Sequence, residues 1–118
     1  HIAHGFGCKV LAYDVSPDQN LSLKLSVDYV GLDDILSRSD IISLHVPLTP
    51  ETKHIIDVAA LNKMKQGAML INTSRGALVH TKALIDSLKS GKLGSAGLDV
   101  YEEEQAYFFQ DLSGQAVN

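Results

Sequence analysis

The 118-residue sequence predicts an α/β fold of the doubly wound type, in which helices cover both faces of a parallel sheet. Short apolar runs alternate along the chain with stretches of helical periodicity, which indicates alternating strands and helices. The apolar runs are nearly continuous, as is typical of strands buried on both faces. The sequence contains no internal repeat, low-complexity segment or linker, so we expect a single α/β unit.

Five apolar runs are expected to form the strands, and three stretches between them are expected to form helices. The chain begins as though within a helix, because Ile2 and Phe6 lie four residues apart and glycines follow. This start, without an initiator methionine, predicts that the chain is cut from a longer protein. The strands are expected at 8–14, 27–30, 40–46, 68–73 and 95–100, and the helices at 32–39, 58–65 and 81–91.

The stretch 81–91 carries the clearest helical pattern. Thr81 is placed to cap its start, and Gly91 is a typical residue to end it. Leu84 and Leu88 lie on one face because they are four residues apart. We therefore expect a helix with an apolar side directed toward the sheet.

Composition excludes several classes of protein. Ten basic and fourteen acidic residues give a formal net charge of −4, and no cluster of Lys and Arg is present, so neither nucleic acid nor a membrane is the expected partner. No apolar run approaches the roughly 18 residues of a membrane helix. Cys8 is the single cysteine, which excludes an intrachain disulfide and favours a cytoplasmic protein. We expect Cys8 itself to be buried where it enters a strand.

Polar or special residues follow four of the predicted strands. They lie in "AYD" (12–14), "LHVP" (44–47), "NTSRG" (72–76) and "LDVYEEE" (98–104). Doubly wound sheets bind ligands beyond the carboxyl ends of their strands. A ligand site at this edge is therefore expected, whereas a purely structural domain would not require these residues.

Asp14 ends the first predicted strand. An acid at this place can accept both ribose hydroxyls of NAD, although an aspartate here can also simply start a turn. The glycine-rich fingerprint that accompanies such an acid lies about 20 residues before it, which places it before residue 1. The "GFG" at 5–7 is a chance match, because it precedes a strand instead of following one.

Arg75 is an unusual residue for a turn of small side chains. Its guanidinium offers two parallel donors that fit a carboxylate, and small neighbours Ser74 and Gly76 would let substrate and cofactor approach the backbone closely. The alternative is a surface arginine that pairs with a nearby acid. Arg75 is thus a candidate binding residue for an acidic substrate.

The acidic run 102–104 has two interpretations. It is a solvated face, or one glutamate turns back to hold a histidine and raise the pKa of that histidine for proton donation. The five histidines do not have the spacing of a metal site, so no metal is expected. His45 is expected to form local hydrogen bonds, and His80 to serve as a surface or capping residue.

Three segments resemble one known family. "KVLAYD" (9–14), "SDIISLHVPLTPETKHII" (39–56) and "MKQGAMLINTSRGALVHTKALIDSLKSGKLGSAGLDVY" (64–101) resemble the NAD-dependent D-isomer-specific 2-hydroxyacid dehydrogenases. "YEEEQAYFFQDLSG" (101–114) is most similar to the D-lactate dehydrogenase branch. The resemblance implies that residues 1–118 are a partial NAD-binding domain with a partial Rossmann-type sheet. The first strand, the glycine-rich loop and the substrate domain would then lie outside this chain.

The resemblance also implies roles for individual residues. Arg75 would bind the carboxylate of a 2-oxo acid such as pyruvate, and Glu104 would support a proton-donating histidine that lies beyond the end of the chain. Gln66 and His80 depart from the family pattern at loop positions. The parent enzyme would be a homodimer. The residues implied to contact NAD are Asp14 at the adenosine ribose, Val46, Pro47, Thr52, Thr73, Ser74 and the backbone of Arg75 along the cofactor, and Asp99 at the nicotinamide end.

Alternatives remain open from the sequence. One is a relative that reduces glyoxylate, hydroxypyruvate or a bulkier 2-oxo acid, and another is a corepressor module that resembles these dehydrogenases. Because the first strand is the middle of a Rossmann sheet, its loss leaves two sheet halves whose facing edges lack a partner. We therefore expect this chain alone to be marginally stable, to bind NAD weakly if at all, and not to turn over.

Overall fold

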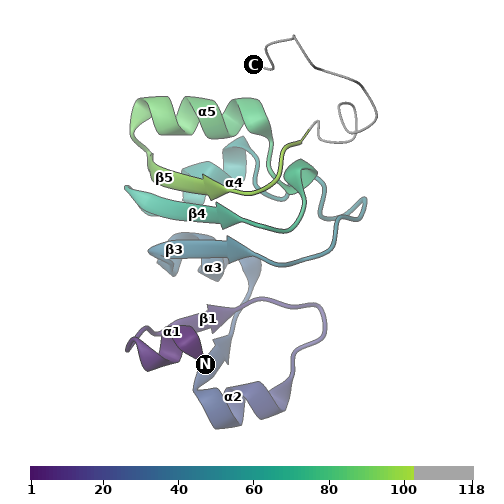
Figure 1. The fold of residues 1–118 in the computed structure, drawn as a ribbon, viewed down its shortest axis with the longest axis vertical. Helices are drawn as coiled ribbons and strands as arrows, with labels where there is room; N and C mark the ends of the chain where they lie inside the picture. Colours follow the sequence, from purple (N-terminus) through teal and green to yellow (C-terminus); the bar gives the residue numbers. More distant parts are fainter. Residues whose placement is uncertain (103–118) are drawn as a thin grey trace.

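The computed structural model describes residues 1–102 and places their strands in two parallel sheets (Figure 1). The first sheet has the order β1-β2, and the second has the order β3-β4-β5. All pairings within both sheets are parallel. The strands are β1 (Val10–Ala12), β2 (Val27–Tyr29), β3 (Ile41–Leu44), β4 (Ala68–Asn72) and β5 (Leu93–Leu98).

The two sheets correspond to the two sides of a Rossmann sheet. In the strand order 3-2-1-4-5-6, β2 and β1 take positions 3 and 2, and β3, β4 and β5 take positions 4 to 6. No strand within residues 1–102 occupies the central position 1. The expected partial Rossmann-type fold is confirmed, with its two halves set apart.

The hydrophobic core lies entirely in the second half. β4 is the central strand of the larger sheet, and Leu70 on it is completely buried between its register partners Ile42 and Ala96. None of residues 1–35 is buried. The core residues are Leu36, Ile42, Leu44, Ile56, Ala60, Leu61, Met64, Ala68, Leu70, Leu78, Val79, Ala83, Leu84 and Leu93.

Three of the helices pack with the larger sheet. α5 contacts β5, α4 contacts α5, and α3 contacts α4. Asp57 starts α4, because its carboxylate accepts the backbone N–H of Ala60 at 2.9 Å. No helix in the described part of the chain is long and apolar enough to cross a membrane. The helices are α1 (Ile2–Gly5), α2 (Gln19–Leu25), α3 (Leu32–Arg38), α4 (Val58–Lys63) and α5 (Thr81–Ser90), with a 3₁₀ turn η1 (Gly76–Leu78).

Each expected strand and helix is present, with its ends within two residues of the expected bounds. The helical start of the chain is confirmed as α1. The helix α2 was not expected, because its leucines at 21, 23 and 25 alternate with polar residues and give no helical periodicity. Two of them, Leu21 and Leu23, are 41% and 84% exposed. The start of α2 is nevertheless marked by Asp18, whose carboxylate accepts the N–H of Asn20.

Two expectations about single residues are wrong. The cap of α5 is His80 rather than Thr81, because the Nδ1 atom of His80 accepts the N–H of Ala83 at 3.2 Å. The hydroxyl of Thr81 is bonded elsewhere, to Glu102. Cys8 is exposed, since it lies in the half of the chain that has no buried residues.

Candidate functional site

The loops that follow β3, β4 and β5 lie at one edge of the larger sheet, because the three strands run parallel (Figure 1). Asn72, the last residue of β4, organises this edge and is 1% exposed. Its side-chain amide donates to the carbonyl of Arg75 at 2.8 Å, and its Oδ1 accepts the N–H of Ser74 at 3.1 Å. Its own carbonyl accepts the N–H of Asp99 at 3.0 Å. One buried amide therefore shapes the turn that carries Arg75 and joins it to the exit of β5.

Four of the residues predicted to contact the cofactor lie in two loops that are bonded to one another or within themselves. The hydroxyl of Ser74 donates to the carbonyl of Val46 at 2.8 Å, which joins the loop after β4 to the loop after β3. Within the latter loop, the hydroxyl of Thr52 donates to the carbonyl of Pro47 at 2.6 Å. These bonds hold the backbone of both loops in a fixed arrangement at the sheet edge.

Arg75 is exposed at this edge. Its Nη1 donates to the carbonyl of Ser74 at 2.9 Å, and it takes part in none of the ion pairs formed within residues 1–102. The alternative of a structural ion pair thus finds no partner in the described part of the chain. A guanidinium with most of its donors directed to solvent is suited to bind an external carboxylate.

Gly76 has a packing reason to be small, in addition to the substrate access expected from the sequence. A Cβ atom on it would lie 1.9 Å from both the carbonyl carbon and oxygen of Tyr101, so any side chain would displace the backbone there. The segment that leaves β5 is thus packed directly against the turn after Arg75.

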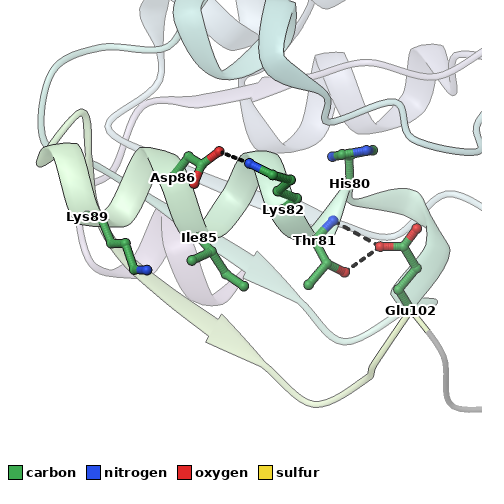
Figure 2. Close-up of a pocket in the computed structure, with 7 residues that line it drawn as sticks. All are labelled: His80, Thr81, Lys82, Ile85, Asp86, Lys89 and Glu102. Carbon is green, nitrogen blue, oxygen red and sulfur yellow. Dashed lines mark hydrogen bonds and ion pairs between the residues drawn. The ribbon is translucent and has the colours of Figure 1, made fainter. Parts of the chain in front are cut away.

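Glu102 forms the most extensively bonded side-chain cluster at this edge. Its carboxylate accepts a hydrogen bond from the hydroxyl of Thr81, and it accepts the N–H of Thr81 at 2.9 Å (Figure 2). It also accepts a hydrogen bond from the ring Nε2 of His54. Partial burial would raise the pKa of Glu102, but the bonds from Thr81 and His54 outweigh it and lower the pKa to about 2. Glu102 is therefore ionised at neutral pH, and His54 is the donor.

The histidine-holding interpretation of the acidic run is thus realised by Glu102 and His54. The acidic run includes Glu102, but nothing in the sequence indicated His54 as its partner, because 48 positions separate the two residues. Glu104, the glutamate to which the resemblance assigned the catalytic role, lies outside the described residues. His45 forms the expected local bond, 2.8 Å from its Nε2 to the hydroxyl of Ser43, although β3 ends one residue before it.

Three further candidates are exposed at strand exits. Thr73 and Asp99 follow β4 and β5, and Asp14 follows β1 in the other sheet. Asp14 Oδ1 accepts the N–H of Ser16 at 2.9 Å, which is the turn-starting geometry. A carboxylate has further acceptor positions, so this bond is compatible with binding of two ribose hydroxyls. No bond joins Asp14 to the cluster around Arg75 within the described residues.

A pocket of about 590 Å³ lies at the start of α5, lined in part by Glu102, Thr81 and Lys82 (Figure 2). It contains none of the predicted site residues that the structure describes. Residues 1–102 also contain no group of three or more side chains suited to hold a metal ion. This pocket is therefore not the site that the sequence predicted.

The sequence profile of the NAD-binding domain of D-isomer specific 2-hydroxyacid dehydrogenases matches residues 1–113. The chain belongs to this family. NAD is accordingly the cofactor of the domain to which it corresponds, and the acceptor at Asp14 fits the ribose of that cofactor.

Individual relatives agree with this assignment. The chain is 53% identical to 2-hydroxyacid dehydrogenase A of Aspergillus oryzae over 99% of its length, which is 33% of that protein. It is 49% identical to D-lactate dehydrogenase of Escherichia coli, with 98% of the chain and 35% of that protein covered. The crystal structure of D-lactate dehydrogenase with NAD⁺ from Lactobacillus jensenii matches with a TM-score of 0.89 at 38% identity, covering 99% of this chain and 35% of that one. The chain thus spans about a third of the length of these relatives.

Proposed function

We propose that residues 1–118 are part of the NAD-binding domain of a longer enzyme that reduces pyruvate to D-lactate with NADH. The observation that carries the proposal is the presentation of Arg75. The buried amide of Asn72 fixes its turn, and the guanidinium faces solvent at the edge where the cofactor loops meet. A cation held there is suited to orient the carboxylate of a small 2-oxo acid beside a nicotinamide.

Different residues of this chain bind different parts of the cofactor and the substrate. Asp14 accepts the adenosine ribose, and the loops that carry Val46 and Ser74 support the cofactor along the sheet edge. NAD supplies the hydride chemistry. Arg75 holds the substrate carboxylate, so that the carbonyl carbon lies in one orientation. Glu104 supports a proton-donating histidine, which belongs to a part of the enzyme beyond this chain.

The remaining features of the parent enzyme follow the same proposal. It is a cytoplasmic homodimer, and its substrate domain lies outside residues 1–118. The chain alone binds NAD weakly and does not turn over, because the centre of its sheet and the histidine are missing. A second candidate is reduction of a different 2-oxo acid, since the relative from Aspergillus oryzae carries the broader name of a 2-hydroxyacid dehydrogenase.

The test is to replace Arg75 in the full-length enzyme. Arg75→Gln is expected to lower kcat/KM for pyruvate by about a hundredfold or more, because a charge-assisted bidentate pair is lost. Arg75→Lys should recover part of that loss, since it restores the charge without the planar pair of donors. NADH oxidation followed by absorbance measures both. Arg38→Gln, on the exposed surface of α3, is the matched control and should be unchanged.

A panel of 2-oxo acids separates the two candidates. Pyruvate is expected to have the highest kcat/KM of the panel. A higher value for glyoxylate, hydroxypyruvate or a bulkier acid would favour the second candidate, while an unaffected Arg75→Gln would contradict both.

A further inference from the structure

The carboxylate of Glu102 joins all three strand exits of the larger sheet. Glu102 itself follows β5, His54 comes from the loop after β3, and Thr81 begins the helix reached after β4. The side chains of His54 and Glu102 are 31% and 25% exposed, so the contact is sheltered from solvent. We call these three residues the exit clamp.

The backbone of the exit clamp is fixed independently of its side chains. The N–H of His54 donates to the carbonyl of Ala77 at 2.8 Å, within η1 and two residues after Arg75. His54 has a positive φ of 54°, an unfavourable conformation for a residue with a side chain, which persists where the surroundings determine it. Its ring also meets the ring of His80 edge to face, with centroids 4.9 Å apart. The loop after β3, the turn η1 and the residue that caps α5 are thus all joined at His54.

One proposed site residue, Arg75, lies within short reach of this clamp. Arg75 immediately precedes η1, the turn to which the backbone of His54 is bonded. Gly76, the first residue of that turn, lies directly against the backbone of Tyr101, the residue before Glu102. A displacement of Glu102 therefore reaches the turn that carries Arg75, and an error of about 1 Å in a substrate-binding group can cost a hundredfold in rate.

We propose that the exit clamp is a positioning device for the reductase chemistry, in which His54 holds Glu102 so that the turn carrying Arg75 keeps its placement. The inference rests on the proposed function. His54 and Glu102 are positioning residues and do not themselves touch the substrate. The specific claim is that a neutral hydrogen-bond donor at position 54 is sufficient, because the clamp works through geometry.

The experiment compares His54→Leu with His54→Gln in the full-length enzyme. Leu removes the donor, whereas the amide of Gln supplies an N–H that can reach the carboxylate. His54→Leu is expected to lower kcat for pyruvate by about tenfold or more per folded molecule, with a smaller change in KM and the NADH Kd within about twofold of wild type. His54→Gln is expected to return kcat to within about threefold of wild type.

Asp86→Asn is the control variant. Asp86 lies on α5, the helix that Thr81 begins, and it pairs with Lys82 at the exposed surface outside the clamp. It should have wild-type kinetics. Folded fractions are measured by circular dichroism, so that lost activity is separated from lost structure. Equal kcat in His54→Leu and wild type, or a His54→Gln as impaired as His54→Leu, would overturn the inference alone. A wild type inactive on every 2-oxo acid would overturn the proposed function and the inference with it.

Discussion

The two halves of the described chain differ in packing far more than in composition. Residues 1–30 contain large apolar side chains, yet Ile2, Phe6, Val15 and Leu23 are each at least 80% exposed. Residues 36–102 hold all fourteen buried apolar residues and the two buried polar ones. The first half has two strands and two short helices, whereas the second has three strands with three helices packed on them. Apolar residues form a core only where a second layer faces them.

The difference implies that the second half carries most of the stability. A two-stranded sheet is marginally stable in water without a packed face, and free strand edges promote association. Of the two buried polar side chains in the second half, Asn72 forms two hydrogen bonds, whereas the hydroxyl of Ser87 has no partner among the described residues. The second half also contains the candidate site residues other than Asp14. The candidate site and the packed core therefore lie in the same half of the chain.

The sharpest test of this comparison is a pair of leucine truncations. Leu70→Ala, in the centre of the larger sheet, is expected to lower the free energy of unfolding by about 3 kcal/mol, because it removes a completely buried side chain and leaves a cavity. Leu11→Ala, in β1, should cost less than about 1 kcal/mol since Leu11 is only partly buried. Urea unfolding followed by circular dichroism measures both. Equal costs would show that the first half is as well packed as the second.

An intermediate effect is expected from acid. The pKa of Glu102 is about 2 in the folded chain against an ordinary value of 4.5, so the unfolded chain binds more protons between these two values. The contribution of Glu102 is therefore fully present above pH 4.5 and is lost as the pH falls toward 2. Glu102→Gln should lower stability by about 2 kcal/mol at neutral pH and should flatten the decline between pH 4.5 and 2.

This acid profile is measured by urea unfolding at a series of pH values. Parallel profiles for wild type and Glu102→Gln would show that the carboxylate of Glu102 is not ionised and bonded as described. Since Glu102 lies in the second half, hydrogen exchange should show the additional acid opening there, at the start of α5.

The smallest expected difference concerns two aspartates that cap helices. Asp57 caps α4 in the second half, and Asp18 caps α2 in the first, each through a bond of 2.9 Å to a backbone N–H. Asp57→Ala should lower global stability by about 1 kcal/mol, the usual cost of a lost cap. Asp18→Ala should leave it nearly unchanged, because α2 can open without disturbing the core. A global loss from Asp18→Ala would mean that the halves unfold as one unit.

Local patterns predicted the fold well because the strands and helices here depend on local sequence. The apolar run at 68–73 is long enough to predict β4. Gly91 predicts the end of α5, and its backbone is left-handed there, with φ of 78°. The cap of α5 was assigned to Thr81 because a hydroxyl is a common cap, although a capping role had also been left open for His80. α2 was missed because its leucines at 21, 23 and 25 alternate with polar residues, which is not a helical spacing.

For the site, the chain order alone indicated Arg75, Asp14 and the strand exits, since parallel strands bring their carboxyl ends to one edge. It did not indicate the buried bonds of Asn72, the contact of Gly76 with the backbone of Tyr101, or the pairing of His54 with Glu102. Residue type and periodicity specify which segments become strands and which ends carry polar groups. Contacts between residues tens of positions apart follow from how the segments pack, because distance in space is set by tertiary structure and not by separation along the chain.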